Sequence, residues 1–231
     1  MDWTVLPGND TDDAETNQRR FRMVGGTMAA ALGWSLFSAW FHLGPPASAF
    51  MTFVLVGSMI AYAAMQKDPL LWRLLLFGLV VGFGELLSDA WGVEGNQTLH
   101  YPDGLKIWCS PWYMPFAWIP VMVQVGWLAV WLQARWGLLA ATAITMALGC
   151  SNIPLYEYLA KAQGTWTYDN CNLLFGTTPY YVILAEALLC AVMPFLLRNV
   201  NRAPLWVIPL LGAAQSAWIL IAGHIALAIT G

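Results

Sequence analysis

Charged residues are scarce in this chain of 231 residues: only 10% are Asp, Glu, Lys or Arg, whereas 59% are hydrophobic. An ordinary soluble domain has about 25% charged residues, so this composition excludes a soluble fold with one core. Long apolar runs recur along the chain, and several approach the roughly 20 residues that cross a bilayer as a helix. The composition therefore predicts an all-α, polytopic membrane protein whose first partner is the lipid bilayer.

Motifs for metal, redox, phosphate and nucleic-acid chemistry are also missing. The three histidines and four cysteines form no HExxH or CxxC pattern, the spacings that zinc and thiol redox sites commonly use. No phosphate-binding glycine loop and no nucleic-acid-binding motif occurs. We therefore expect no metal site, no cofactor and no nucleic-acid partner.

Seven apolar runs are present, at 23–43, 47–65, 69–89, 113–133, 136–160, 177–197 and 204–230. They predict about seven helices in a single transmembrane domain over 23–231, preceded by a polar cytoplasmic tail over 1–22. Eight Lys and Arg residues fall in the segments on the N-terminal side of the membrane, against Lys106 and Lys161 on the other side. This asymmetry predicts a cytoplasmic N-terminus and a multi-pass protein of the inner or plasma membrane if the host is bacterial.

Ionisable side chains inside apolar runs mark functional sites, because charge is costly there. Glu186 lies within the run 177–197, roughly 14 Å below its outer end at a rise of about 1.5 Å per residue. Glu85 and Asp89 are four residues apart and share a helix face, and Glu157 lies near the end of the run 136–160. Desolvation and mutual repulsion separate such carboxylates into an acid and a base. These four are our candidate catalytic residues.

Structural roles for the same carboxylates remain open. Glu85 and Asp89 are also typical of a helix that ends among lipid headgroups, and Glu186 is also typical of a buried interhelical hydrogen bond. Cys109 and Cys171 fall in the two outer loops, so a disulfide between them is a further open possibility if those loops face an oxidising compartment.

A degenerate internal repeat relates 84–118 to 151–190. Four positions have equal or nearly equal spacing in the two copies: Glu85 with Asn152, Tyr101 with Tyr168, Pro111 with Pro179, and Trp118 with Glu186. The pattern predicts a three-helix repeat that carries the site.

Aromatic and polar side chains around the carboxylates are candidate substrate-binding residues: Asn152, Tyr156, Trp118, Tyr113, Trp166, Tyr168 and Tyr181. Aromatic faces stabilise cations, which suits a site that generates a carbocation, although an interfacial aromatic belt has the same composition. Asn152 would also suit a structural role, because Pro154 leaves a helix carbonyl without its amide partner.

The motif W-x-Y, followed by a proline and then a glutamate within a span, is formed by Trp166, Tyr168, Pro179 and Glu186. Together with seven spans and the repeat, it resembles the integral-membrane isoprenoid cyclases. That group includes the heterodimer-type lycopene cyclases, carotenoid hydratases and small membrane terpene cyclases. The lycopene cyclases carry adjacent glutamates after the proline, whereas this chain has one, further along. The resemblance covers 84–190 and implies proton-initiated cyclisation, isomerisation or hydration of a hydrophobic isoprenoid or carotenoid, without metal or redox cofactor.

Two other functions fit the same sequence. One is a non-catalytic accessory or scaffold subunit of a larger membrane complex, which could bind pigment. Such a subunit would have other membrane subunits as partners and would use Glu186 for an interhelical hydrogen bond. A small-solute transporter would suit the repeat, although paired interrupted helices at the membrane midplane are not evident.

Overall fold

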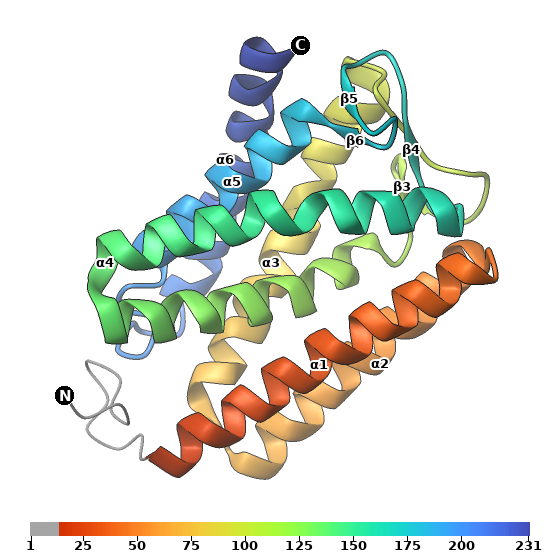
Figure 1. Ribbon diagram of the computed structural model, residues 1–231. Helices are drawn as coiled ribbons and strands as arrows, with labels where there is room; N and C mark the ends of the chain where they lie inside the picture. Colours follow the sequence, from red (N-terminus) through yellow and green to blue (C-terminus); the bar gives the residue numbers. More distant parts are fainter. Residues whose placement is uncertain (1–13) are drawn as a thin grey trace.

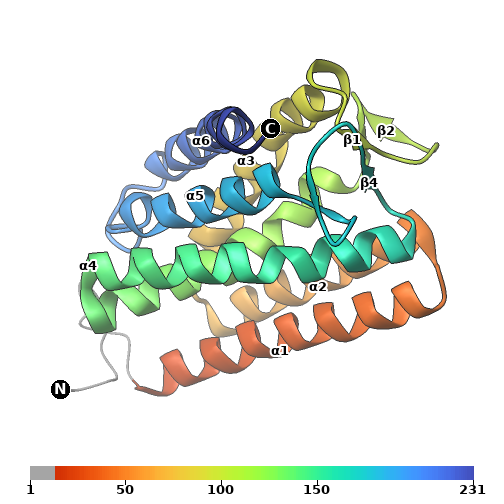
Figure 2. The same ribbon diagram turned by 45° about the horizontal axis from the view of Figure 1, so that its top comes forward.

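The computed structural model describes residues 14–231, and this part of the chain is a bundle of six α-helices with short strands at one end (Figure 1). The helices are α1 (Ala14–Trp40), α2 (Gly44–Gln66), α3 (Pro69–Ala90), α4 (Met114–Gln163), α5 (Tyr180–Leu196) and α6 (Val207–Thr230), and the π-helical turn η1 (Trp91–Gly95) continues α3. Figure 2 shows α1 and α2 on one side of α4, with α5 and α6 on the other.

Six α-helices correspond to the seven expected apolar runs, because α4 contains the run 136–160 and all but the first residue of the run 113–133. Its two arms meet at Gly137, whose φ of 80° and ψ of 172° interrupt the helix. A residue without a Cβ adopts such a positive φ at little cost. The chain reverses direction there, and the second arm returns towards the strands (Figure 1).

Helix α1 begins at Ala14 and therefore extends into the segment 1–22 that we expected to be a polar tail; residues 1–13 lie outside the described residues. Arg20 is 1% exposed within this helix. Its guanidinium donates to Asp68 through Nε to Oδ2 at 2.6 Å and through a terminal nitrogen to Oδ1 at 2.7 Å. Because Asp68 neutralises the buried charge, the helix continues through a position that the sequence marks as polar.

Four helical segments are long and apolar enough to cross a membrane: Gly44–Gln66, Pro69–Gly95, Met114–Gln163 and Val207–Thr230. Helix α5 is apolar but shorter, with 17 residues. Apart from Lys106 and Lys161, which lie at the strand end, the Lys and Arg residues lie at the start of α1, around the α2–α3 junction, at the bend of α4 and in the α5–α6 connection, at the end opposite the strands (Figure 1).

The two long connections have the same order of elements. The first connection (91–113) contains β1 (Leu99–His100), β2 (Lys106–Ile107) and β3 (Ser110–Pro111), and the second (164–179) contains β4 (Thr167–Tyr168), β5 (Leu173–Leu174) and β6 (Thr178–Pro179). In each, the last two strands form a hairpin. The first strands pair with each other, antiparallel, with Leu99 opposite Tyr168. This pairing joins the two connections at the end of the bundle (Figure 2).

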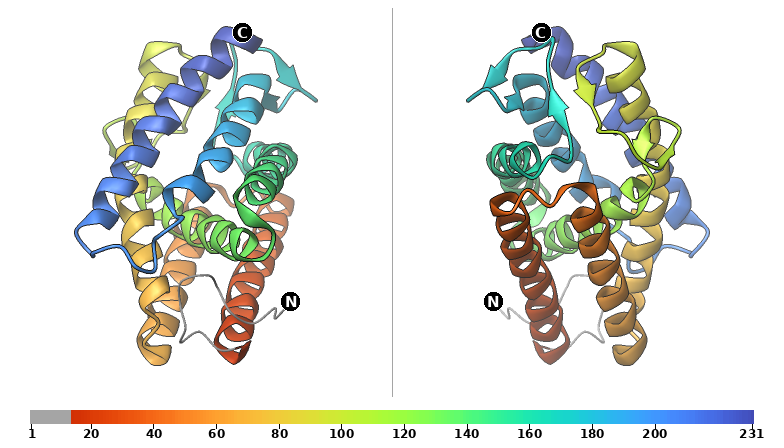
Figure 3. Two further views of the ribbon diagram at one scale, coloured as in Figure 1. Left: turned by 90° about the vertical axis from the view of Figure 1, so that its left-hand side faces the viewer. Right: turned by 90° about the vertical axis from the view of Figure 1, so that its right-hand side faces the viewer.

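Helix α3 packs tightly between α4 and α6, because its glycines permit close approach. A Cβ at Gly82 would lie 1.9 Å from the carbonyl oxygen of Pro115 on α4, and one at Gly84 would lie 2.3 Å from Ser216 Oγ on α6. The last turns of α3 are consequently enclosed by two other helices. The end of α6 lies beside the strands (Figure 3).

A candidate acid–base site

Four carboxylates converge near the strand end of the bundle. Glu85 and Asp89, one turn apart on α3, are 6% and 5% exposed, and Glu157 on the second arm of α4 is 5% exposed. Glu186 on α5 is half-buried. Its backbone lies against α4, since a Cβ at Gly149 would be 2.8 Å from its carbonyl oxygen. We call these four residues the carboxylate cluster.

The members of the carboxylate cluster are near enough for their charges to interact. Glu85 lies next to Asp89 and within electrostatic reach of Glu186, while Glu157 lies within reach of both Asp89 and Glu186. The structure thus brings together the four side chains that the sequence singled out, from three helices. Within residues 14–231, no group of three or more His, Cys, Asp and Glu side chains has an arrangement that could hold a metal ion.

Two of the carboxylates receive hydrogen bonds from the connections. Tyr101 donates to Asp89 Oδ2 at 2.9 Å. Trp166 donates from its indole nitrogen to Glu157 Oε2 at 2.6 Å, and Tyr168 donates to Glu157 Oε1 at 3.3 Å. Each connection therefore supplies donors to the carboxylate at the end of the helix that precedes it.

The β1–β4 pair covers the carboxylate cluster with one face. Side chains alternate along a strand, so Tyr101 and Trp166 face inwards, with ring centroids 6.4 Å apart in an edge-to-face contact. On the outer face, His100 Nε2 and Asp169 Oδ1 are 2.6 Å apart. The backbone amide of Asp169 also donates to the carbonyl of Thr98 at 3.1 Å. These contacts fasten the two connections together above the carboxylates.

The inward tyrosines keep their protons. Burial raises the pKa of Tyr101 well above its usual value, and the nearby charges of Asp89 and Glu85 raise it further. Burial and the charge of Glu157 have the same effect on the pKa of Tyr168. Both phenols are therefore neutral hydrogen-bond donors at neutral pH.

The candidate substrate-binding residues fall into three groups. Trp166 and Tyr168 contact Glu157 directly, and Trp118 lies beside Glu85. Tyr113, which is buried next to Ser48, and Tyr181, which shares a 2.8 Å hydrogen bond with Thr98, are within electrostatic reach of Asp89. Asn152 is exposed and Tyr156 is half-buried, and neither hydrogen-bonds a carboxylate within residues 14–231. The structure thus brings five of the seven to the carboxylate cluster.

Sequence reasoning missed Tyr101 as a site residue, although the repeat had already matched it with Tyr168. It also missed Thr98, for which no signal existed, because its role depends on contact with Tyr181 from α5. Cys109 and Cys171 are free thiols, so the disulfide that we left open is not formed. Burial raises the pKa of both thiols, and the charge of Glu94 adds to the effect at Cys109.

Fold and site together define a mostly helical protein with four helices able to cross a membrane and a buried carboxylate cluster at one end. Within that class, the chain belongs to the DUF6989 family: the model of this domain of unknown function matches residues 86–230. The matched region includes Asp89, Glu157 and Glu186 as well as both connections. No curated protein and no solved structure matches the chain.

Proposed function

We propose that the chain is an integral-membrane enzyme that moves protons on a hydrophobic isoprenoid or carotenoid, without metal or redox cofactor. A proton would be added to one carbon–carbon double bond to give a cation. That cation would lose a proton to a carboxylate, from another carbon either directly or after ring closure, or from the oxygen after capture of water. The observation that supports this proposal most is the convergence of four carboxylates, from α3, α4 and α5, in an apolar and largely buried setting. The resemblance to isoprenoid cyclases points to the same chemistry.

Hydrogen bonds and neighbouring charge together divide the carboxylates into two kinds: Trp118 also donates to Glu85, but the adjacent Asp89 opposes ionisation of Glu85. Donors to a carboxylate favour its ionised form, and Asp89 and Glu157 each receive such donors. Glu85 Oε2 is buried and has no hydrogen-bond partner within residues 14–231, a setting that favours the protonated acid. We therefore assign proton donation to Glu85, with Glu186 as the second acid, and proton removal to Asp89 or Glu157.

Aromatic rings flank both kinds of carboxylate. Trp118 lies beside Glu85, and Trp166 and Tyr168 contact Glu157. A carbocation formed between these carboxylates would be stabilised by the faces of the rings, and their bulk would keep water away from it.

The proposal includes a membrane arrangement. The six helices would supply seven spans, with the two arms of α4 counted separately. The end of the bundle opposite the strands, where most Lys and Arg residues lie, would face the cytoplasm. The three-helix repeat is supported by the identical order of strand, hairpin and proline in the two connections. In this orientation the carboxylate cluster lies in the outer half of the membrane, within reach of hydrophobic molecules in the outer leaflet.

A comparison of lipid extracts tests the proposed chemistry. Wild type, Glu85→Gln, Glu186→Gln and the matched control Glu15→Gln, which lies on α1 far from the carboxylate cluster, would be expressed in cells that accumulate linear isoprenoids. Liquid chromatography with mass spectrometry should find a product of unchanged mass, or one heavier by a water molecule, in wild type and control alone. Identical extracts from equally abundant proteins would contradict catalysis on these substrates and would favour a scaffold role.

A further inference from the structure

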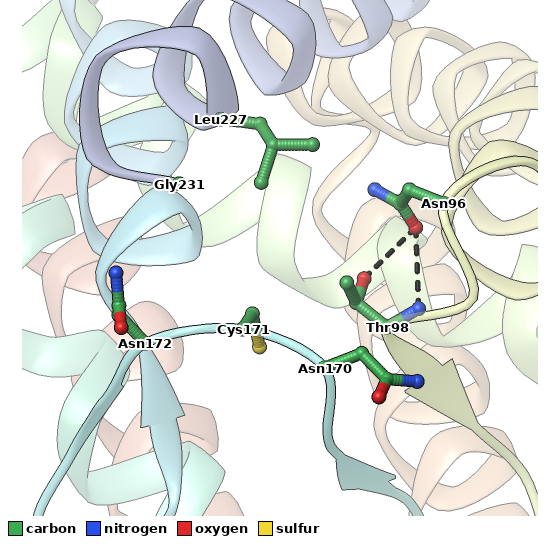
Figure 4. A pocket seen from close by; sticks show the side chains of 7 residues that line it. All are labelled: Asn96, Thr98, Asn170, Cys171, Asn172, Leu227 and Gly231. Carbon is green, nitrogen blue, oxygen red and sulfur yellow. Dashed lines mark hydrogen bonds between the residues drawn. The ribbon is translucent and has the colours of Figure 1, made fainter.

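A cavity of about 540 Å³ lies at the strand end of the bundle. Its walls come from both connections and from the last turn of α6, and six side chains line it: Asn96, Thr98, Asn170, Cys171, Asn172 and Leu227 (Figure 4). This volume is within the range of small-molecule sites. Neither the carboxylate chemistry nor the packing of the helices uses this cavity.

A hydrogen-bonded pair links the lining of the cavity to a residue near the carboxylate cluster. Thr98 lines the cavity, and its Oγ1 lies 2.8 Å from the phenol oxygen of Tyr181. Tyr181 in turn lies within electrostatic reach of Glu157 and Asp89. A ligand that occupies the cavity would therefore have one end close to the carboxylate cluster.

Asn96 has an unused donor beside the cavity. Its Oδ1 accepts from the amide nitrogen of Thr98 at 3.3 Å and from Thr98 Oγ1 at 2.9 Å. Its Nδ2 is buried and has no hydrogen-bond partner within residues 14–231, and Figure 4 shows this nitrogen directed to the side of the cavity where Leu227 lies. An unpaired buried donor costs free energy, which a ligand oxygen at this position would recover.

The chemistry of the lining disfavours an anionic ligand group. Three carboxamides and one hydroxyl provide neutral donors and acceptors, and no Lys, Arg or His side chain lines the cavity. Phosphates are bound chiefly by cationic side chains and helix N-termini. The carboxamides are also held in place, since Asn170 donates to the Gln97 carbonyl at 3.1 Å and Asn172 to the Thr230 carbonyl at 3.2 Å.

We propose that this cavity binds the uncharged, oxygen-bearing end of an amphipathic ligand, a hydroxyl or a carbonyl group, through Asn96 Nδ2. The hydrocarbon part packs against Leu227 and extends towards the carboxylate cluster. The choice of an isoprenoid as the hydrocarbon rests on the proposed function. The binding of a neutral polar group in this cavity does not rest on it.

Alkylation of Cys171 in the purified full-length protein tests this assignment, because the thiol lines the cavity. N-ethylmaleimide labelling at pH 8.5 would be followed by mass spectrometry with geranylgeraniol, geranylgeranyl diphosphate or squalene as the probe. We expect the alcohol to slow the labelling of Cys171 at least fivefold and the other two probes to leave it unchanged. Labelling of Cys150, a half-buried thiol on α4, is the internal control and should not change.

The variant Asn96→Asp sharpens the test. It keeps the oxygen that accepts from Thr98 but replaces the unused donor with an acceptor, so protection by the alcohol should disappear while the melting temperature is retained. Equal protection by all three probes, protection by the diphosphate alone, or no protection by the alcohol would each overturn the proposal.

The variant Glu85→Gln separates this proposal from the proposed chemistry, because Glu85 does not line the cavity. Protection by the alcohol in this variant, without product in the extracts of wild type or of the Glu15→Gln control, would contradict the catalytic proposal and leave the cavity assignment standing. Product formation by wild type without protection of Cys171 would contradict the cavity assignment alone.

Discussion

Tyr101 donates a 2.9 Å hydrogen bond to Asp89, twelve residues earlier in the chain. Tyr168 has the same relationship to Glu157, eleven residues earlier, at 3.3 Å. Each connection thus returns a phenol to the carboxylate at the end of its own preceding helix. The pairing of β1 with β4 sets Tyr168 opposite Leu99 and brings Tyr101 against Trp166, so donors from both connections lie on one face of the strand pair.

The bond between Trp166 and Glu157 should matter more for stability than the bond between Tyr168 and Glu157. At 2.6 Å the indole donates the shorter bond, and hydrogen bonds to charged groups contribute about 1.5–3 kcal/mol. We expect Trp166→Phe to lower the melting temperature of the detergent-purified protein more than Tyr168→Phe does. The exposed Trp40 provides the matched control. Equal melting temperatures for the Trp166→Phe and Trp40→Phe variants would contradict this expectation.

The buried ion pair between Arg20 and Asp68 should be sensitive to loss of one charge. The variant Asp68→Asn retains an oxygen that can accept from the Leu71 amide at the start of α3, but it removes the negative charge of Asp68 from the buried guanidinium of Arg20. Breaking a buried pair in this way costs about 3–5 kcal/mol.

The control for this variant is Glu15→Gln, which removes the charge of one exposed partner of Arg19 and should cost less than about 1 kcal/mol. Abundance in the membrane and the melting temperature after purification measure both effects. Equal stability of the two variants would show that the buried pair does not hold α1 against the start of α3.

The contact between α3 and α4 should not tolerate a methyl group at Gly82. A Cβ there would lie 1.9 Å from a backbone oxygen of Pro115, so Gly82→Ala must move a helix that carries two of the carboxylates. At Gly57 on α2, nothing lies within 4 Å of the added atom, and Gly57→Ala should stabilise the helix by about 0.5–1 kcal/mol. Thermal unfolding that ranks the two variants in the opposite order would contradict the close packing of α3.

Alkaline pH should destabilise the protein through Tyr101 and Tyr168. Their pKa values in the folded protein lie well above the usual value near 10. At a pH between the usual pKa and the raised pKa, the unfolded chain loses phenol protons that the folded protein keeps. The two phenols therefore contribute fully to stability below about pH 10 and progressively less above it, by up to about 1.4 kcal/mol per phenol for each pH unit.

Melting temperatures between pH 8 and pH 11 measure this effect. The double variant Tyr101→Phe, Tyr168→Phe should have a lower melting temperature at pH 8 but a shallower decline above pH 10 than wild type. Parallel declines in the two proteins would show that these phenols ionise equally in the folded and unfolded states.

The sequence predicted the helical class and the four carboxylates because both follow from local properties. Apolar runs mark helices able to cross a membrane, and a carboxylate inside such a run is conspicuous. The run 136–160 was separated from its neighbour by Arg135, whereas the structure joins both runs in α4 through Gly137. The start of α1 was placed too late, because the partner of Arg20 lies 48 residues away and no local pattern reveals it.

The β1–β4 strand pair that lies over the carboxylate cluster could not be predicted from the sequence. Strands of two residues have no detectable periodicity, and β1 pairs with a strand from the other connection. The repeat matched Tyr101 with Tyr168, and in the structure each of these tyrosines donates to a buried carboxylate. It also matched Glu85, which is buried, with Asn152, which is exposed. The carboxylates that accept from these two tyrosines are Asp89 and Glu157. Their separation in the chain differs by one residue from the separation of the two tyrosines.

Deuterium incorporation tests the central proposal most directly. The purified protein would be incubated in D₂O with a linear isoprenoid, and the product analysed by mass spectrometry. If a carboxylic acid of the cluster protonates a double bond, the product of wild type should carry one new carbon–deuterium bond, and Glu85→Gln should form no labelled product. A cyclised or isomerised product without deuterium, or the same labelled product at the same rate from Glu85→Gln, would contradict the account.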